Sequence, residues 1–164
     1  MFKKIAIAAA LAMIASSSFA ADVAGVYAGA SVGSTKVDGL SGHKTSLIGF
    51  VGYQFTDALA AEASYGRVAK YDFYPATVKM NQTALSVVGS VPMGNGFKLF
   101  GRLGYNYMEA TGSAGSYSHT ESTSKALYGI GVSYAIVQNV SARFEVTKPS
   151  SDATNVALGV AYKF

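Results

Sequence analysis

Apolar and polar residues alternate along most of this chain, and the stretch Asn155–Phe164 shows the pattern most regularly. Its apolar residues all share one parity: Val156, Leu158, Val160, Tyr162 and Phe164. Small or polar residues occupy the other parity. Because successive side chains of a β-strand point to opposite faces, the stretch is predicted to be a strand with one apolar face. Its closing aromatic residue is typical of a strand that ends at a membrane interface.

The same alternation predicts seven further strands. The eight predicted ranges are Gly25–Ser34, Lys44–Phe55, Leu59–Val68, Gln82–Val91, Phe97–Tyr107, Lys125–Ile136, Val140–Thr147 and Asn155–Phe164. Their lengths suit tilted strands that cross a bilayer, which need about 9–11 residues. Long and short links alternate between them, as in barrels with long external loops and short periplasmic turns. The predicted fold is therefore all-β: an eight-stranded antiparallel transmembrane β-barrel, an up-and-down meander.

Two of the long links are strongly polar, and both are predicted to be external loops. Residues 70–79 contain lysines, an aspartate and a proline, and Thr111–Ser124 is rich in Gly, Ser, Thr and Ala. The second composition is typical of a mobile loop.

Aromatic residues on the apolar parity fall at two levels. One group lies near the short turns or the C-terminus: Tyr53, Phe55, Phe97, Tyr134, Tyr162 and Phe164. The other group lies near the long links: Tyr65, Tyr105, Tyr107 and Tyr128. Two aromatic girdles around an apolar band indicate a bilayer environment. The alternative is a soluble barrel whose apolar face points inward, which would expose the charged residues of the other parity.

The N-terminus is predicted to be a cleaved signal peptide. Lys3 and Lys4 precede the apolar run Ile5–Ile14, and Ser18-Phe19-Ala20 supplies small residues for cleavage. The run is shorter than the ~20 residues of a spanning helix, which disfavours a retained anchor. Residues 1–20 are thus assigned to the signal peptide and residues 21–164 to one barrel domain. The predicted location is the cell outer membrane of a Gram-negative bacterium.

Composition narrows the functional classes. Half of the residues are hydrophobic, 13% are charged, and there is no cysteine. A small exported domain without disulfides needs another source of stability, and a closed sheet in lipid provides one by pairing every backbone group. The net charge of +4 falls to about +2 without Lys3 and Lys4, too little to indicate nucleic acid. No metal-ligand cluster, phosphate-binding loop or cysteine nucleophile is present, so no cofactor is predicted.

Several short motifs follow one another along the chain: Gly49–Thr56 with Ala61–Tyr65, then Gly129–Tyr134, Ala142–Glu145 and Gly159–Phe164. In this order and spacing they resemble the OmpA-like transmembrane domain and the small OmpX-type and opacity-type barrels. The resemblance implies an inward cluster of charges at Glu62, Arg102, Arg143 and Glu145. It also implies that Tyr162 and Phe164 belong to the signal read by the outer-membrane assembly machinery. Where the family can carry a lysine and an acid, this chain has Val88 and Ser133, so a smaller cluster is expected.

The four interior charges have two interpretations. Two acids and two arginines can neutralise one another, which favours a structural plug because unpaired charges in a low-dielectric interior are costly. The alternative is a narrow path for ions or protons.

Basic residues gather at the predicted external rim: Lys36, Lys44, Arg67, Lys70, Lys79, Lys125 and Lys148. They form either a solvated loop surface or a ring that contacts lipopolysaccharide phosphates. His119, Glu121 and Ser122 superficially suggest a catalytic constellation, but a flexible loop positions such groups poorly. The chain is therefore predicted not to be an enzyme, with lipid A modification as the enzymatic alternative.

The predicted function is a structural or adhesive role through external loops, and the alternative is a small pore. The expected partners are outer-membrane lipid, lipopolysaccharide, the assembly machinery and a surface ligand. The barrel is expected to be a monomer.

Overall fold

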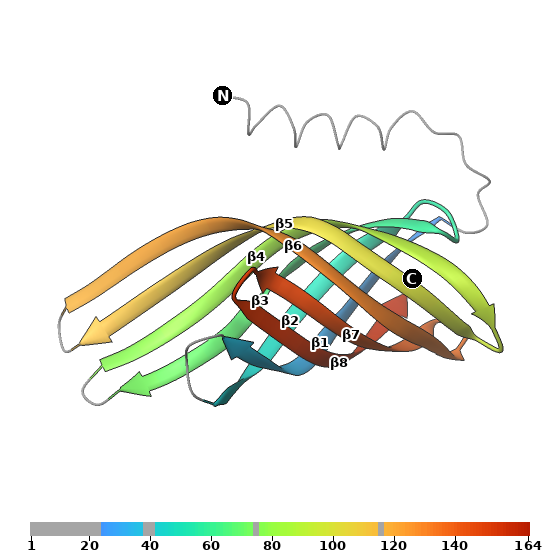
Figure 1. The fold of residues 1–164 in the computed structure, drawn as a ribbon. Coiled ribbons are helices and arrows are strands. Elements are labelled where there is room, and N and C mark those ends of the chain that lie inside the picture. Colours follow the sequence, from blue (N-terminus) through green and yellow to red (C-terminus); the bar gives the residue numbers. More distant parts are fainter. Residues whose placement is uncertain (1–23, 38–41, 74–75, 115–116) are drawn as a thin grey trace, which may run out of the picture.

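A computed structural model describes residues 24–37, 42–73, 76–114 and 117–164, and they form one closed antiparallel barrel (Figure 1). Its strands are β1 (Gly25–Val37), β2 (His43–Gln54), β3 (Leu59–Phe73), β4 (Ala76–Gly94), β5 (Phe97–Ala114), β6 (Tyr117–Val137), β7 (Val140–Ser150) and β8 (Ala153–Lys163). Each strand pairs with the next, and β8 pairs with β1. The predicted eight-stranded meander is confirmed. Within the described residues, no helix is long and apolar enough to span a membrane. The expected signal peptide lies outside the described residues.

The two links predicted as loops are mostly strand, and that prediction was wrong. Lys70 pairs with Lys79 across β3 and β4, and Thr111 pairs with Thr120 across β5 and β6. In these segments the apolar alternation fades while the backbone ladder continues. A sequence pattern that depends on burial therefore missed them.

The extra length of β3–β6 forms a sheet that runs past the other four strands (Figure 1). We call residues 68–73, 76–81, 109–114 and 117–127 the sheet extension. Its ladders are continuous from β3 to β4, from β4 to β5 and from β5 to β6. The pairing of β3 with β2 stops at Arg67, and that of β6 with β7 stops at Tyr128. The sheet extension therefore has two edges.

Five large side chains that fill the lumen each lie opposite a glycine on a neighbouring strand. Tyr27 lies opposite Gly52, and Phe50 lies opposite Gly29. The same arrangement holds for Phe100 and Gly131, Arg102 and Gly129, and Arg143 and Gly159. A methyl group on Gly29 or Gly131 would collide with the ring of the opposed phenylalanine. A narrow eight-stranded barrel thus accommodates five bulky side chains by alternating large and small residues.

Glycines on the outer face have the opposite environment. A methyl group built on Gly49, Gly89 or Gly101 would find no atom closer than 3.8 Å. Large apolar residues surround them, and Leu103 is 71% exposed. Aromatic pairs lie on the same face near the short turns: Tyr53 with Phe55, Phe97 with Tyr134, and Tyr162 with Phe164. The outer face is therefore the apolar one, as the alternation predicted.

We predict that Gly29→Ala lowers the free energy of unfolding by roughly 1–3 kcal/mol, the usual cost of overpacking. The matched change Gly49→Ala, on the outer face, should leave stability unchanged or slightly improved. Urea unfolding of the barrel in lipid vesicles measures both variants. Equal changes in stability for the two variants would show that a methyl group in the lumen costs no more than one on the outer face, which would contradict the tight packing at Gly29.

Candidate functional site

Four charged side chains meet inside the barrel, and they come from three strands. Glu62 lies on β3, Arg102 on β5, and Arg143 and Glu145 lie on β7. Glu62 is 1% exposed, Arg102 6% and Arg143 8%. The structure thus brings together all four residues that the sequence assigned to an interior cluster, with two charges of each sign.

Arg102 joins the two acids. Its Nε donates a hydrogen bond to Glu145 Oε1 over 2.6 Å, and its Nη2 donates to Glu145 Oε2 over 3.2 Å. The same Nη2 forms an ion pair with Glu62 Oε1 at 2.5 Å. Such two-point contact with a carboxylate fixes the guanidinium in one orientation.

Arg143 completes the cluster and lies over two aromatic rings. Its Nη1 donates to Glu62 Oε2 over 2.9 Å, whereas its Nη2 lies 3.8 Å from Glu145. Its Cζ lies 4.5 Å from the ring centroid of Phe50 and 4.8 Å from that of Phe100. Cation–π attraction in a desolvated setting contributes about 2 kcal/mol or more. Because the Glu62 carboxylate is closer than that of Glu145, the main acidic partner of Arg143 is Glu62 rather than its neighbour on the same strand.

Neutral groups add hydrogen bonds around Glu62. The Tyr27 hydroxyl donates to Glu62 Oε2 over 3.1 Å. Ser86 Oγ accepts a hydrogen bond from Arg102 and donates one to the main-chain oxygen of Glu62. The sequence did not identify Ser86, although its inward parity between buried Ala84 and Val88 was available as a signal.

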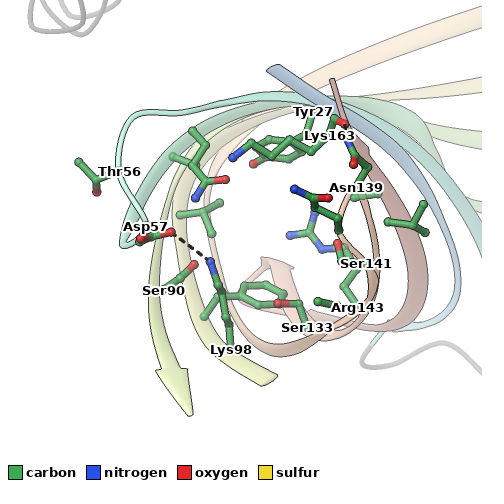
Figure 2. A pocket seen from close by; sticks show the side chains of 18 of the residues that line it. Tyr27, Thr56, Asp57, Ser90, Lys98, Ser133, Asn139, Ser141, Arg143 and Lys163 are labelled. Carbon is green, nitrogen blue, oxygen red and sulfur yellow. Dashed lines mark hydrogen bonds and ion pairs between the residues drawn. The ribbon is translucent and has the colours of Figure 1, made fainter. Parts of the chain in front are cut away.

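The cluster separates two cavities. One, of about 260 Å³, lies at the end of the barrel that carries the short turns, and Arg143 forms part of its wall (Figure 2). At its rim Lys98 forms an ion pair with Asp57 at 3.6 Å. The other cavity, of about 40 Å³, lies on the far side of Arg143 and is lined by Glu62, Arg102 and Glu145. The charged side chains and the two phenylalanines thus occupy the middle of the lumen.

A second polar group fills the lumen toward the opposite end. Asn155 Nδ2 donates to Thr35 Oγ1 over 2.8 Å and to Ser46 Oγ over 2.6 Å. Asn106 Nδ2 donates to the main-chain oxygen of Pro149. Asn106 has the same inward parity as Arg102, but the sequence gave no signal for either set of contacts, because the residues involved come from five different strands.

The structure divides the seven basic residues of the predicted rim. Arg67 lies opposite outward Leu47, and Lys148 lies opposite outward Tyr128. Lys36 shares the parity of the exposed residues of β1. Lys44 and Lys125 instead lie opposite Thr35 and Asn106, two residues of the inward parity. The side chains of Lys70 and Lys79 lie outside the described part of the chain. Of the seven basic residues, three (Lys36, Arg67 and Lys148) are therefore placed on the outer face. The side chain of His119 also lies outside the described part.

The two residues of the expected assembly signal point away from the lumen. Tyr162 is 48% exposed and Phe164 is 74% exposed, and their ring centroids are 5.1 Å apart. Asn139, in the turn between β6 and β7, holds this end of β8 by donating from its side chain to Lys163 O over 2.8 Å. The final residues are thus fixed beside a short turn with their aromatic rings outward.

A closed eight-stranded barrel with an apolar, aromatic-flanked exterior and a paired polar interior defines a membrane-spanning β-barrel. Residues 6–164 match the family model of the outer membrane protein beta-barrel domain. The chain belongs to this family, and its location is the outer membrane. Its short turns accordingly mark the periplasmic end and the sheet extension the extracellular end. The search of curated proteins gave no significant match.

Solved structures of small outer-membrane barrels have the same fold. Neisserial surface protein A is 19% identical with a TM-score of 0.70, covering 85% of this chain and 96% of its own. The N-terminal β-barrel domain of Pseudomonas aeruginosa OprF is 19% identical with a TM-score of 0.65, covering 86% and 99%. Ail, the attachment invasion locus protein of Yersinia pestis, is 17% identical with a TM-score of 0.61, covering 86% and 97%. At these identities the likeness concerns the fold.

We predict that Arg143→Met lowers the free energy of unfolding by roughly 3–5 kcal/mol, because the buried cluster loses one of its two cations and keeps both acids. A second change, Glu62→Gln, should recover more of that loss than Glu145→Gln does. The first leaves the two-point pair of Arg102 and Glu145 intact, and the second breaks it. Urea midpoints of the two double variants decide the matter, and better recovery with Glu145→Gln would contradict the observed pairing.

Proposed function

We propose that this protein is a surface interaction protein that binds its partner through the sheet extension. The observation that supports this proposal is the edge of β6. Residues 117–127 are paired with β5 along their whole length, and no described strand lies on their other side. At about 3.3 Å per residue this edge is roughly 36 Å long.

An unpaired edge presents a row of backbone N–H and C=O groups to any incoming strand. A partner with an exposed strand can add to it by main-chain hydrogen bonds, a mode known as β-augmentation. The β6 edge suits this mode because its ladder with β5 has no bulge and its sequence has no proline. Its serines and threonines leave the edge hydrated until a partner arrives.

The β3 edge of the same sheet is poorly suited to this role. Beyond Arg67 it has only six described residues, and its ladder with β4 shifts register at Val68. A bulge bends a strand and interrupts the regular row of backbone groups, which protects an edge from pairing. The two edges differ in the way expected if one alone serves as the binding strand.

Two alternatives have less support. A pore requires a continuous lumen, whereas the paired charges and Phe50 and Phe100 separate the two cavities. Lipid A modification requires fixed catalytic groups. Ser122 lies opposite Glu109 on a solvent-exposed ladder, and the His119 side chain lies outside the described residues. A non-enzymatic, non-conducting barrel that acts at its extracellular surface accounts best for these features.

The similar barrels agree with a role at the surface. Ail is named for attachment and invasion, and it has been solved in complex with the heparin analogue sucrose octasulfate. We extend to this chain the idea of attachment to a cell surface. Its assembly as a monomer, with Tyr162 and Phe164 read by the assembly machinery, belongs to the same proposal.

We predict that a proline on the free side of β6 weakens attachment of cells producing the protein to cultured cells by about fivefold, the effect of one net hydrogen bond of roughly 1 kcal/mol. Thr123→Pro and Ser124→Pro provide the test. Consecutive residues direct their N–H groups to opposite sides, so one of the two variants removes a donor from the free edge and the other from the β5 ladder. The variant that loses its donor on the free edge should assemble normally, as measured by the heat-dependent shift in gel mobility.

The matched controls Thr123→Ala and Ser124→Ala keep both N–H groups and should attach like the parent. Full attachment by a correctly assembled proline variant on the free side would overturn the proposed use of the β6 edge.

A further inference from the structure

The lipid-facing surface contains one groove of about 710 Å³ that the lumen and the sheet extension do not explain. It runs across β3–β8, with Leu59, Val87, Leu103, Ile130 and Val146 among its lining residues. Leu103 and Ile130 are more than half exposed, so the groove opens outward rather than into the lumen.

Two glycines make the floor of the groove. Gly89 on β4 lies directly opposite Gly101 on β5, and both belong to the outward parity. On the neighbouring rows stand Val87 with Leu103 and Val91 with Leu99, which are larger. The absence of side chains at one row between two bulkier rows produces the hollow. In a membrane such a hollow must be filled by hydrocarbon, because an empty apolar surface loses its dispersion contacts.

The groove has a chemically distinct end. Its lining reaches Tyr128 and Lys148, which lie opposite each other near the extracellular end of β7. Lys148 forms no ion pair with any described residue, and no carboxylate lines the groove. A partly exposed lysine at the headgroup level favours an anionic group, and a tyrosine beside it suits the same interface.

We propose that this groove binds one acyl chain of a phosphorylated outer-leaflet lipid, with its phosphate at Lys148. The outward side chains Val87, Leu103 and Ile130 are apolar and Lys148 at the extracellular end is basic, which matches an amphiphile with an anionic head. A second copy of this chain fits less well, because the groove has no acid to receive the other copy's Lys148. The site is separate from the β6 edge, so its test does not depend on the proposed attachment function.

The test uses the purified whole barrel in detergent with hexa-acylated lipid A and its dephosphorylated form, and it measures retained lipid by native mass spectrometry. Gly101→Leu fills the floor without a backbone clash, because a Cβ there would meet only Gly129 O at 3.9 Å. It should lower retention of both lipids by about tenfold, since the leucine takes the place of several buried methylene groups. Lys148→Gln should lower retention of the phosphorylated form alone, by about fivefold.

The matched control is Gly49→Leu, an outward glycine on β2 that is equally open and lies outside the groove. It should retain lipid like the parent. Equal retention by the Gly101 and Gly49 variants would overturn the site and leave only ordinary boundary lipid. A dimer in the parent that Gly101→Leu dissolves would overturn the choice of occupant in favour of a second copy.

Discussion

The rest of the structure depends on how a narrow barrel accommodates the guanidinium of Arg143. That cation lies over the rings of Phe50 and Phe100 and donates to Glu62, three contacts that come from three different strands. Each ring lies opposite a glycine, Gly29 for Phe50 and Gly131 for Phe100, and a methyl group on either glycine would collide with the ring. Charge pairing, aromatic packing and glycine placement are thus one constraint. Removing any part leaves either a buried charge without its partner or a collision.

Part of this arrangement could be predicted from the sequence. Alternation alone indicated the eight strands and the face on which Glu62, Arg102, Arg143 and Glu145 lie, because burial in lipid on one side imposes a strict period of two. The ends of β3–β6 could not be predicted in the same way. Outside the membrane both faces of a strand meet water, so pairing continues without an apolar pattern at Thr111 or Thr120.

The sequence also could not show which charged side chains of the cluster pair with each other. Parity places Arg143 and Glu145 on the same face, which suggests that they pair, yet the tilt of the strands brings Arg143 closer to Glu62. The sequence shows that these glycines have inward parity. Only the pairing of the strands shows which large residue lies opposite each one. Closing the lumen in this way leaves the outer surfaces as the places for interaction: a hydrated edge above the membrane and an apolar groove within it.

The most direct test of this account is hydrogen exchange of the guanidinium protons of Arg102 and Arg143, followed by NMR in lipid. If the cluster is closed and packed as described, both arginines should exchange slowly, because opening requires disruption of the paired charges. Arg143 protons should also show contacts to both phenylalanine rings. Exchange of both arginines at the rate of exposed side chains, with no ring contacts, would contradict the claim that this cluster seals the barrel.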